Sequence, residues 1–169
     1  MQQRKIPPRR LAELSVLTAV SLIMFIIEMQ LPPVVPVPGV KLGLANIITV
    51  YAVYCCEPYE AVMVFAARVL LGSLFSGNVT ALIFSISGGV LCLLGMLLLR
   101  RFTDADMMIP ASVIGAVLHN VGQTAAAVFV MNTTAVTAYL PYLMFSGCVA
   151  GAFTGTCAYL TVKRIKRKQ

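Results

Sequence analysis

One arginine lies where a cation is difficult to accommodate, because Arg68 is near the middle of the apolar stretch VMVFAARVLLGSLF. A guanidinium that is shielded from water needs an anionic or other hydrogen-bonding partner. A second apolar stretch holds His119, Asn120 and Gln123, whose spacings of one, three and four positions place them on one face of a helix. The four residues predict a site in which Arg68 neutralises an anionic or carbonyl-rich group and the other three supply hydrogen bonds.

Three further polar residues lie near a proline-rich segment, LPPVVPVPGVK. Glu28 precedes this segment, Lys41 ends it and Asn46 follows it. If the apolar stretches cross a membrane, Arg68 and His119 lie near its midplane, and the other three residues lie toward its outer side. This distribution predicts a cavity that opens outward beneath the proline-rich loop. The alternative is a structural network in which Arg68 pairs with Glu28.

The composition indicates that most of these residues are surrounded by lipid. The chain has 169 residues, of which 59% are hydrophobic and 11% charged, and its mean hydropathy is +0.90. A soluble domain has about a quarter charged residues. The net charge of +7 does not indicate nucleic-acid binding, because the basic residues flank apolar stretches, as the positive-inside rule describes. All cations except Lys41 and Arg68 are therefore expected to serve membrane topology.

The apolar stretches predict an all-α membrane protein with a bundle of six transmembrane helices. A helix needs about 20 apolar residues to cross the hydrocarbon layer, and the second stretch is short by this measure. The expected spans are residues 11–30, 42–56, 60–75, 79–99, 108–130 and 138–162. The predicted domain organisation is a basic segment at 1–10, a single six-helix domain at 11–162 and a basic tail at 163–169.

The basic residues also predict the orientation of the bundle. An even number of spans returns the basic C-terminal tail to the side of the basic N-terminal segment, and Arg100 and Arg101 after the fourth span fall on that side too. The positive-inside rule makes this the cytoplasmic side. We expect a multi-pass protein of the bacterial cytoplasmic membrane with both termini in the cytoplasm.

Two sets of small residues predict close approach between helices. The set in the last span recurs every four residues and consists of Gly147, Gly151 and Gly155. The set in the first span consists of Ala12, Ser15 and Ala19. We expect the glycines to pack within the protein, with a partner interface as the alternative, whereas both possibilities stay open for the first span.

The sequence contains no recognisable catalytic pattern. Its single histidine has no partner in the pattern of a triad or a metal site. Its two aspartates, Asp104 and Asp106, form one short pair, whereas prenyl transfer uses acidic motifs on two facing helices to hold magnesium and diphosphate. The five cysteines form no CxxC pair, and no GxxxxGK[ST] loop is present. We therefore expect no enzyme activity, no ATP hydrolysis, no cofactor and no metal.

Three motifs together resemble a known family of membrane proteins. PGVKLGLAN (38–46), RVLLGSLFSG (68–77) and HNVGQ (119–123) are similar to motifs of the Gx transporter family, whose members are often labelled heptaprenyl diphosphate synthase component I. The resemblance covers residues 11–160. The family is grouped with the substrate-binding S components of energy-coupling factor importers. This grouping implies a six-helix bundle with cytoplasmic termini, an outward-facing pocket under the first outer loop, and a partner transmembrane subunit with two ATPases.

The candidate residues lie inside these motifs, since the first holds Lys41 and Asn46, the second Arg68, and the third the residues at 119, 120 and 123. The resulting hypothesis is a membrane-embedded protein that binds a small, anionic or polar molecule for uptake, with Lys41 steering or covering the ligand. The alternative is a non-transporting membrane partner of a polyprenyl diphosphate synthase or of quinone- or flavin-linked electron transfer.

Overall fold

The computed structural model describes residues 6–30, 43–77, 79–103 and 107–167. Within these ranges the chain forms six α-helices and one short 3-10 helix, and no strand. The elements are α1 (Pro8–Gln30), α2 (Leu44–Cys55), α3 (Pro58–Ser76), α4 (Val79–Arg100), α5 (Met108–Met131), η2 (Thr134–Tyr139) and α6 (Leu140–Lys166). The predicted six-helix bundle of an all-α membrane protein is confirmed.

The helix lengths agree with the predicted spans. Five helical stretches are long and apolar enough to cross a membrane, and α2 is a shorter apolar helix of 12 residues. At 1.5 Å per residue α2 is about 18 Å long, whereas the hydrocarbon core is about 30 Å thick. At the other extreme, α6 continues as far as Lys166. The basic segment that was predicted as a separate tail from residue 163 therefore begins as helix.

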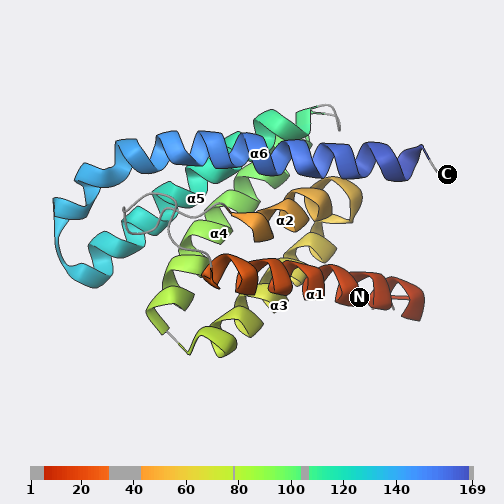
Figure 1. The fold of residues 1–169 in the computed structure, drawn as a ribbon, viewed down its shortest axis with the longest axis horizontal. Helices are drawn as coiled ribbons and strands as arrows, with labels where there is room; N and C mark the ends of the chain where they lie inside the picture. Colours follow the sequence, from red (N-terminus) through yellow and green to blue (C-terminus); the bar gives the residue numbers. More distant parts are fainter. Residues whose placement is uncertain (1–5, 31–42, 78, 104–106, 168–169) are drawn as a thin grey trace.

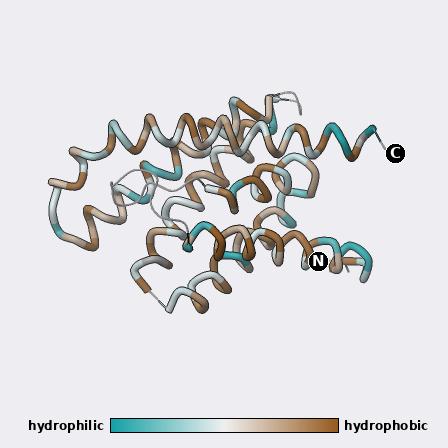
Figure 2. The backbone as a smooth tube through the Cα atoms, in the orientation of Figure 1, coloured by the Kyte–Doolittle hydropathy of each residue, from teal (hydrophilic) through white to brown (hydrophobic). Residues whose placement is uncertain are grey.

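Successive helices run in opposite directions between the two ends of the bundle (Figure 1). The start of α1, the turn between α2 and α3, and the end of α6 lie at one end, which we call the terminal end. The end of α3, the start of α4 and the 3-10 helix η2 lie at the other. Hydrophilic residues are concentrated near the two termini, and mostly hydrophobic residues cover the helices between the ends (Figure 2).

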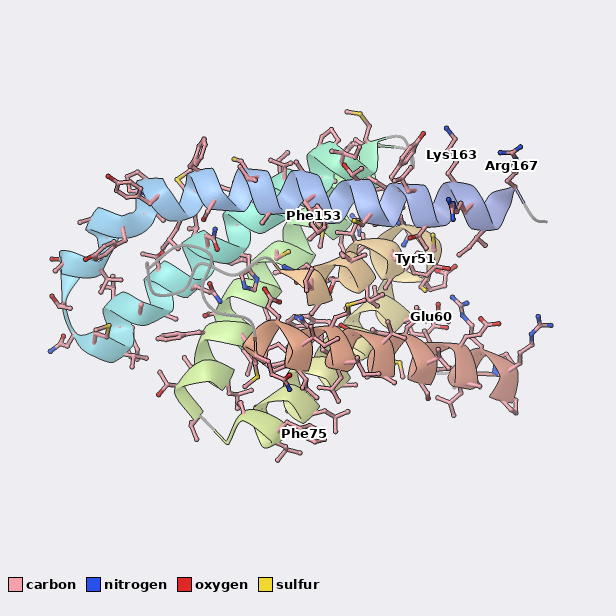
Figure 3. All side chains as sticks on the ribbon, viewed as in Figure 1. Tyr51, Glu60, Phe75, Phe153, Lys163 and Arg167 are labelled. Carbon is pink, nitrogen blue, oxygen red and sulfur yellow. The ribbon has the colours of Figure 1, made fainter. Side chains whose placement is uncertain are left out.

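The core of the bundle surrounds α2, and the outer surface is apolar. Val50 and Val53 of α2 are fully buried. On the outside, Phe129 of α5 and Phe145 of α6 are largely exposed, and Phe75 of α3 points away from the bundle (Figure 3). Large exposed aromatic and aliphatic side chains in this number are typical of helices that face lipid.

Glycines bring α4, α5 and α6 into backbone contact. A Cβ atom added at Gly122 of α5 would lie 2.6 Å from the carbonyl oxygen of Ser87 in α4. A Cβ at Gly151 of α6 would lie 2.7 Å from the Cα of Val113 in α5, and one at Gly155 would lie 2.9 Å from the Cα of Ile109, whereas Gly147 lies against the side chain of Asn120. The structure thus places the predicted glycine set of α6 against α5, inside the protein.

In contrast, α1 is peripheral. Leu14 and Ser21 are its buried residues, and it packs against α2 and α3. The small residues predicted as a contact face, Ala12, Ser15 and Ala19, are all exposed. This face of α1 therefore contacts lipid or another molecule rather than a helix of the described chain.

An ion pair joins the beginning of α1 to the beginning of α3. Arg10 Nε donates to Glu60 Oε1 at 2.9 Å, and Arg10 Nη2 donates to Glu60 Oε2 at 2.6 Å. Glu60 is only 2% exposed, and its Oε2 also accepts from the backbone N–H of Glu57 at 2.8 Å. Figure 3 shows Glu60 near α1, toward the end of the bundle that holds Lys163 and Arg167. Arg10 therefore has a structural contact beyond the topological role that the sequence suggested.

A second basic residue of the predicted topological set also has a structural contact. Arg100, the last residue of α4, donates from Nη1 to the carbonyl oxygens of Val53 at 2.5 Å and Cys56 at 2.6 Å. The last carbonyls of a helix have no partner within the helix, and a cation near them is also favoured by the helix dipole. Arg100 therefore caps the C-terminal end of α2.

Candidate functional site

A partly open cavity lies between the six α-helices, and its space, including the part open to solvent, amounts to about 880 Å³. The predicted site residues that line it are Glu28, Asn46, Arg68, His119, Asn120 and Gln123. They come from α1, α2, α3 and α5. Lys41 lies outside the described residues. Six of the seven residues that were singled out from the sequence thus meet around one space.

Arg68 is the most unusual member of this lining. It lies in the middle of α3, is 8% exposed, and its guanidinium carbon is 5.6 Å from the centroid of the Phe65 ring, one turn earlier. It forms no hydrogen bond or ion pair with any residue in the described ranges, and its Nε atom is buried. A buried guanidinium has five N–H donors and pays a large desolvation penalty when they have no acceptor. Arg68 is therefore suited to receive an anion in the cavity.

The three polar residues of α5 line the cavity together, as expected from their spacing. Asn120 Nδ2 donates to the carbonyl oxygen of Leu143 in α6 at 2.5 Å, which fixes the orientation of this amide. Gly88 of α4 lies against the other two, because a Cβ atom there would come within 2.7 Å of the His119 carbonyl oxygen and of Gln123 Cγ. These contacts hold α5 between α4 and α6 with its polar face toward the cavity.

Glu28 links the end of α1 to the start of α2. Its Oε1 accepts a hydrogen bond from the backbone N–H of Gly43 at 2.5 Å. Gly43 has φ 69°, a left-handed conformation that glycine adopts readily, and its carbonyl oxygen accepts from the N–H of Asn46 at 2.8 Å. This arrangement places Glu28 and Asn46 at the edge of the cavity near the N-terminus of α2.

The direct ion pair considered as an alternative, between Arg68 and Glu28, is not formed. Both residues are described, and no nitrogen of Arg68 lies within 4.0 Å of a carboxylate oxygen of Glu28. The two charges face the same cavity and interact electrostatically across it. Arg68 is therefore not neutralised by the residue that the sequence offered as its structural partner.

Several lining residues were not identified from the sequence. Ser73 and Ser76 of α3, Ser85 of α4 and Thr154 of α6 all line the cavity. Ser76 lies eight positions after Arg68 and thus on the same helical face, so its spacing was a signal that could have identified it. Thr154 lies three positions after Gly151 and thus on the glycine face of α6, but its contact with Ser112 at 3.0 Å depends on how α5 and α6 meet.

The cavity lies in the half of the bundle away from the terminal end. Glu28 is near the C-terminus of α1, Asn46 near the N-terminus of α2, and Ser76 is the last residue of α3. Arg68 and His119, which also line it, lie near the middle of their helices. If the terminal end is cytoplasmic, the cavity faces outward.

The described ranges contain no group of three or more His, Cys, Asp or Glu side chains that is arranged to hold a metal ion. Of the cysteines, Cys55 and Cys148 are exposed, whereas Cys56 and Cys92 are buried. Asp104 and Asp106 lie outside the described residues. The polar side chains that line the cavity carry hydroxyl, amide, imidazole, guanidinium and carboxylate groups.

Comparison with known proteins gives one match. The model of a family described as heptaprenyl diphosphate synthase component I matches residues 17–161. This range includes every residue of the cavity lining. No curated protein and no solved structure matches the chain.

Proposed function

Because the chain belongs to the heptaprenyl diphosphate synthase component I family, we propose that it is a membrane-embedded protein that binds a small anionic or polar molecule for uptake. Multi-pass insertion follows from its helices. We assign the protein to the bacterial cytoplasmic membrane, with both termini in the cytoplasm, because basic residues flank the start of α1, the end of α4 and the end of α6.

One observation carries this proposal: Arg68 is a buried cation without a partner in the described chain, and it faces a cavity. An ionisable residue within a membrane domain is expensive and indicates function unless a structural partner satisfies it. An anionic group of the ligand supplies the missing partner. His119, Asn120, Gln123 and Asn46 provide hydrogen bonds that orient the rest of the ligand.

Uptake requires an energy source that this chain does not contain, because it has no phosphate-binding loop for ATP. We propose that a transmembrane subunit associated with ATPases supplies it. The exposed face of α1, with Ala12, Ser15 and Ala19, allows a second helix to approach closely and is the surface that we assign to this contact.

The family description supports a second candidate function. "Component I" denotes one part of a synthase of more than one component, so the chain is alternatively a membrane partner of a soluble prenyl synthase. Co-purification distinguishes the two functions. Recovery of a soluble prenyl synthase, without an ATPase, favours the second, and recovery of ATPase subunits favours uptake.

We propose further that the chain does not catalyse prenyl transfer by itself. Its two aspartates form one short pair, which is too few for two magnesium-binding motifs. Turnover of an allylic diphosphate by the purified chain alone would contradict this.

The direct experiment is a binding measurement on the purified protein in lipid nanodiscs. Ligand-dependent thermal shifts are recorded with a panel of vitamins, nucleobases and isoprenoid phosphates, for the wild type and for Arg68→Gln. Arg101→Gln is the matched control, because Arg101 is exposed at the terminal end and does not line the cavity. We expect at least one compound to stabilise the wild type and the control, and not Arg68→Gln. Equal binding by Arg68→Gln would overturn the site assignment.

A further inference from the structure

We propose that the ligand is zwitterionic, with an anionic group bound by Arg68 and a cationic group, such as a primary ammonium, bound by Glu28. This inference rests on the proposed function, because it specifies the substrate class of the same cavity. It assigns Glu28 as the residue that determines specificity between zwitterions and simple anions.

The argument begins with the charges of the cavity. Among its described lining residues, Arg68 is the cation and Glu28 the anion, with the imidazole of His119 counted as neutral. These two charges are not within 4.0 Å of each other, so within the described residues Arg68 has no anionic partner and Glu28 has no cationic one. A monoanion at Arg68 leaves the carboxylate of Glu28 without a cation in the same cavity and is repelled by it. A zwitterion neutralises both charges at once.

The hydrogen bonds of Glu28 leave room for such a cation. Its Oε1 accepts from the N–H of Gly43 at 2.5 Å, whereas its Oε2 accepts no hydrogen bond from the described residues. A carboxylate has about four acceptor positions, so one backbone N–H satisfies only a part of them. The contact with Gly43 also fixes the carboxylate at the edge of the cavity, so little entropy is lost when the ligand binds.

The remaining lining fits the middle of a polar molecule. Asn46, Asn120 and Gln123 are neutral amides that both donate and accept hydrogen bonds. These residues add no net charge, so the two charged ends of the ligand are set by Arg68 and Glu28 alone within the described lining. Ligands with one charge lack one of these two interactions.

The test uses three matched series of probes on the protein in nanodiscs: linear ω-amino carboxylates of increasing chain length, the carboxylates without the ammonium group, and the amines without the carboxylate. Affinities are measured by calorimetry and thermal shift. We expect the best amino carboxylate to bind the wild type at least tenfold more tightly than its matched carboxylate or amine. The number of carbon atoms between the ammonium and the carboxylate of the best probe indicates the distance between Glu28 and Arg68 in the complex.

Two variants assign the two ends of the ligand. Glu28→Gln is expected to lower the affinity for the amino carboxylate at least tenfold and to raise the affinity for the matched carboxylate, since the repelling charge is removed. Arg68→Gln is expected to lower the affinity for both ligands. Glu13→Gln is the matched control, because it removes the same charge from α1 at a position about 22 Å away along the helix, where Glu13 is half exposed and pairs with Arg10. This control is expected to bind like the wild type.

The outcomes separate the inference from the proposed function. If carboxylates bind the wild type as tightly as amino carboxylates and Glu28→Gln leaves that order unchanged, the ligand is a simple anion and the zwitterion assignment is wrong, while the anion site at Arg68 stands. If none of the three series binds the wild type, the zwitterion assignment is also wrong, and the vitamin and nucleobase panel alone decides the proposed function. If Arg68→Gln binds amino carboxylates as tightly as the wild type does, the zwitterion assignment and the proposed anion site at Arg68 are both wrong.

Discussion

The guanidinium of Arg10 forms two parallel hydrogen bonds with the carboxylate of Glu60, at 2.9 and 2.6 Å. Arg68, in the middle of the same helix that carries Glu60, forms none within the described chain. Two arginines of one small bundle are thus in opposite electrostatic situations. We expect the first to stabilise the fold and the second to reduce its stability in the absence of a ligand. The two should therefore respond in opposite ways to the same kind of substitution.

Arg68→Met is expected to raise the thermal stability of the ligand-free protein. It replaces a buried cation that has no ion-pair partner among the described residues by an apolar side chain of similar length, a change that typically stabilises a protein by on the order of 1 kcal/mol or more. The melting temperature in nanodiscs measures the effect. A fall in melting temperature would show that Arg68 holds the helices together, as the structural alternative requires.

Arg10→Gln is expected to destabilise the protein, because it leaves the carboxylate of Glu60 buried without its cation. The loss should be about 2 kcal/mol, below that of a fully buried pair because the Arg10 side chain is 30% exposed. The control is Arg9→Gln, since the Arg9 side chain is 93% exposed and lies 3.6 Å from Glu13. Equal melting temperatures for the two variants would contradict the structural role that we assign to Arg10.

Arg100→Gln is expected to loosen the C-terminal end of α2. The substitution removes two hydrogen bonds to the carbonyl groups of Val53 and Cys56 and a favourable interaction with the helix dipole, which together contribute about 1 kcal/mol. Hydrogen exchange measured by mass spectrometry should show faster exchange for the peptide that contains α2. Arg101→Gln, which changes the exposed neighbour, should leave that exchange rate as it is.

Gly155→Ala is expected to destabilise the contact between α5 and α6. The added Cβ would lie 2.8 Å from Ser112 Cβ and 2.9 Å from Ile109 Cα, and the backbone cannot give way as a flexible side chain can. Overpacking of this kind costs about 1–3 kcal/mol. Cys148→Ala on an exposed position of the same helix serves as the control for melting temperature. An unchanged melting temperature in Gly155→Ala would mean that the two helices move apart without penalty.

Reporter fusions test the orientation of the bundle. Both termini lie at the terminal end, and a green fluorescent protein joined to either terminus is expected to fluoresce, as it does when it folds in the cytoplasm. An alkaline phosphatase joined at the same places should be inactive. The reverse pattern would place the cavity on the cytoplasmic side and would contradict uptake through an outward-facing pocket.

The helices were predictable because each apolar stretch ends at residues that cannot continue it. Ser76 and Gly77 end α3 where the sequence indicated, and Gly77 has φ 61°, a left-handed conformation that glycine allows. The polar face of α5 was predictable for a related reason, since a spacing of three and four residues already determines which side chains share a face. These features depend on neighbours in sequence.

Features that depend on pairing between distant helices were not predictable in this way. Arg10 and Glu60 are 50 positions apart, and nothing local to either indicates that they meet. The partner of Glu28 was missed for a different reason. It is a backbone N–H, at Gly43, and every residue other than proline offers one. Only the folded arrangement selects Gly43 among them.

The shortness of α2 affects how the membrane potential is distributed across the protein. A helix of about 18 Å leaves roughly two fifths of the hydrocarbon thickness unfilled, and the cavity lies beside its N-terminus. Where water enters such a space, the voltage falls mainly across the remaining thickness. A charge that reaches Arg68 from the open side then crosses only a small part of the field, whereas about 2.3 kcal/mol per 100 mV applies to a unit charge that crosses all of it. Binding in the cavity would then depend little on voltage, and the electrical work would be done in the step that carries the ligand onward.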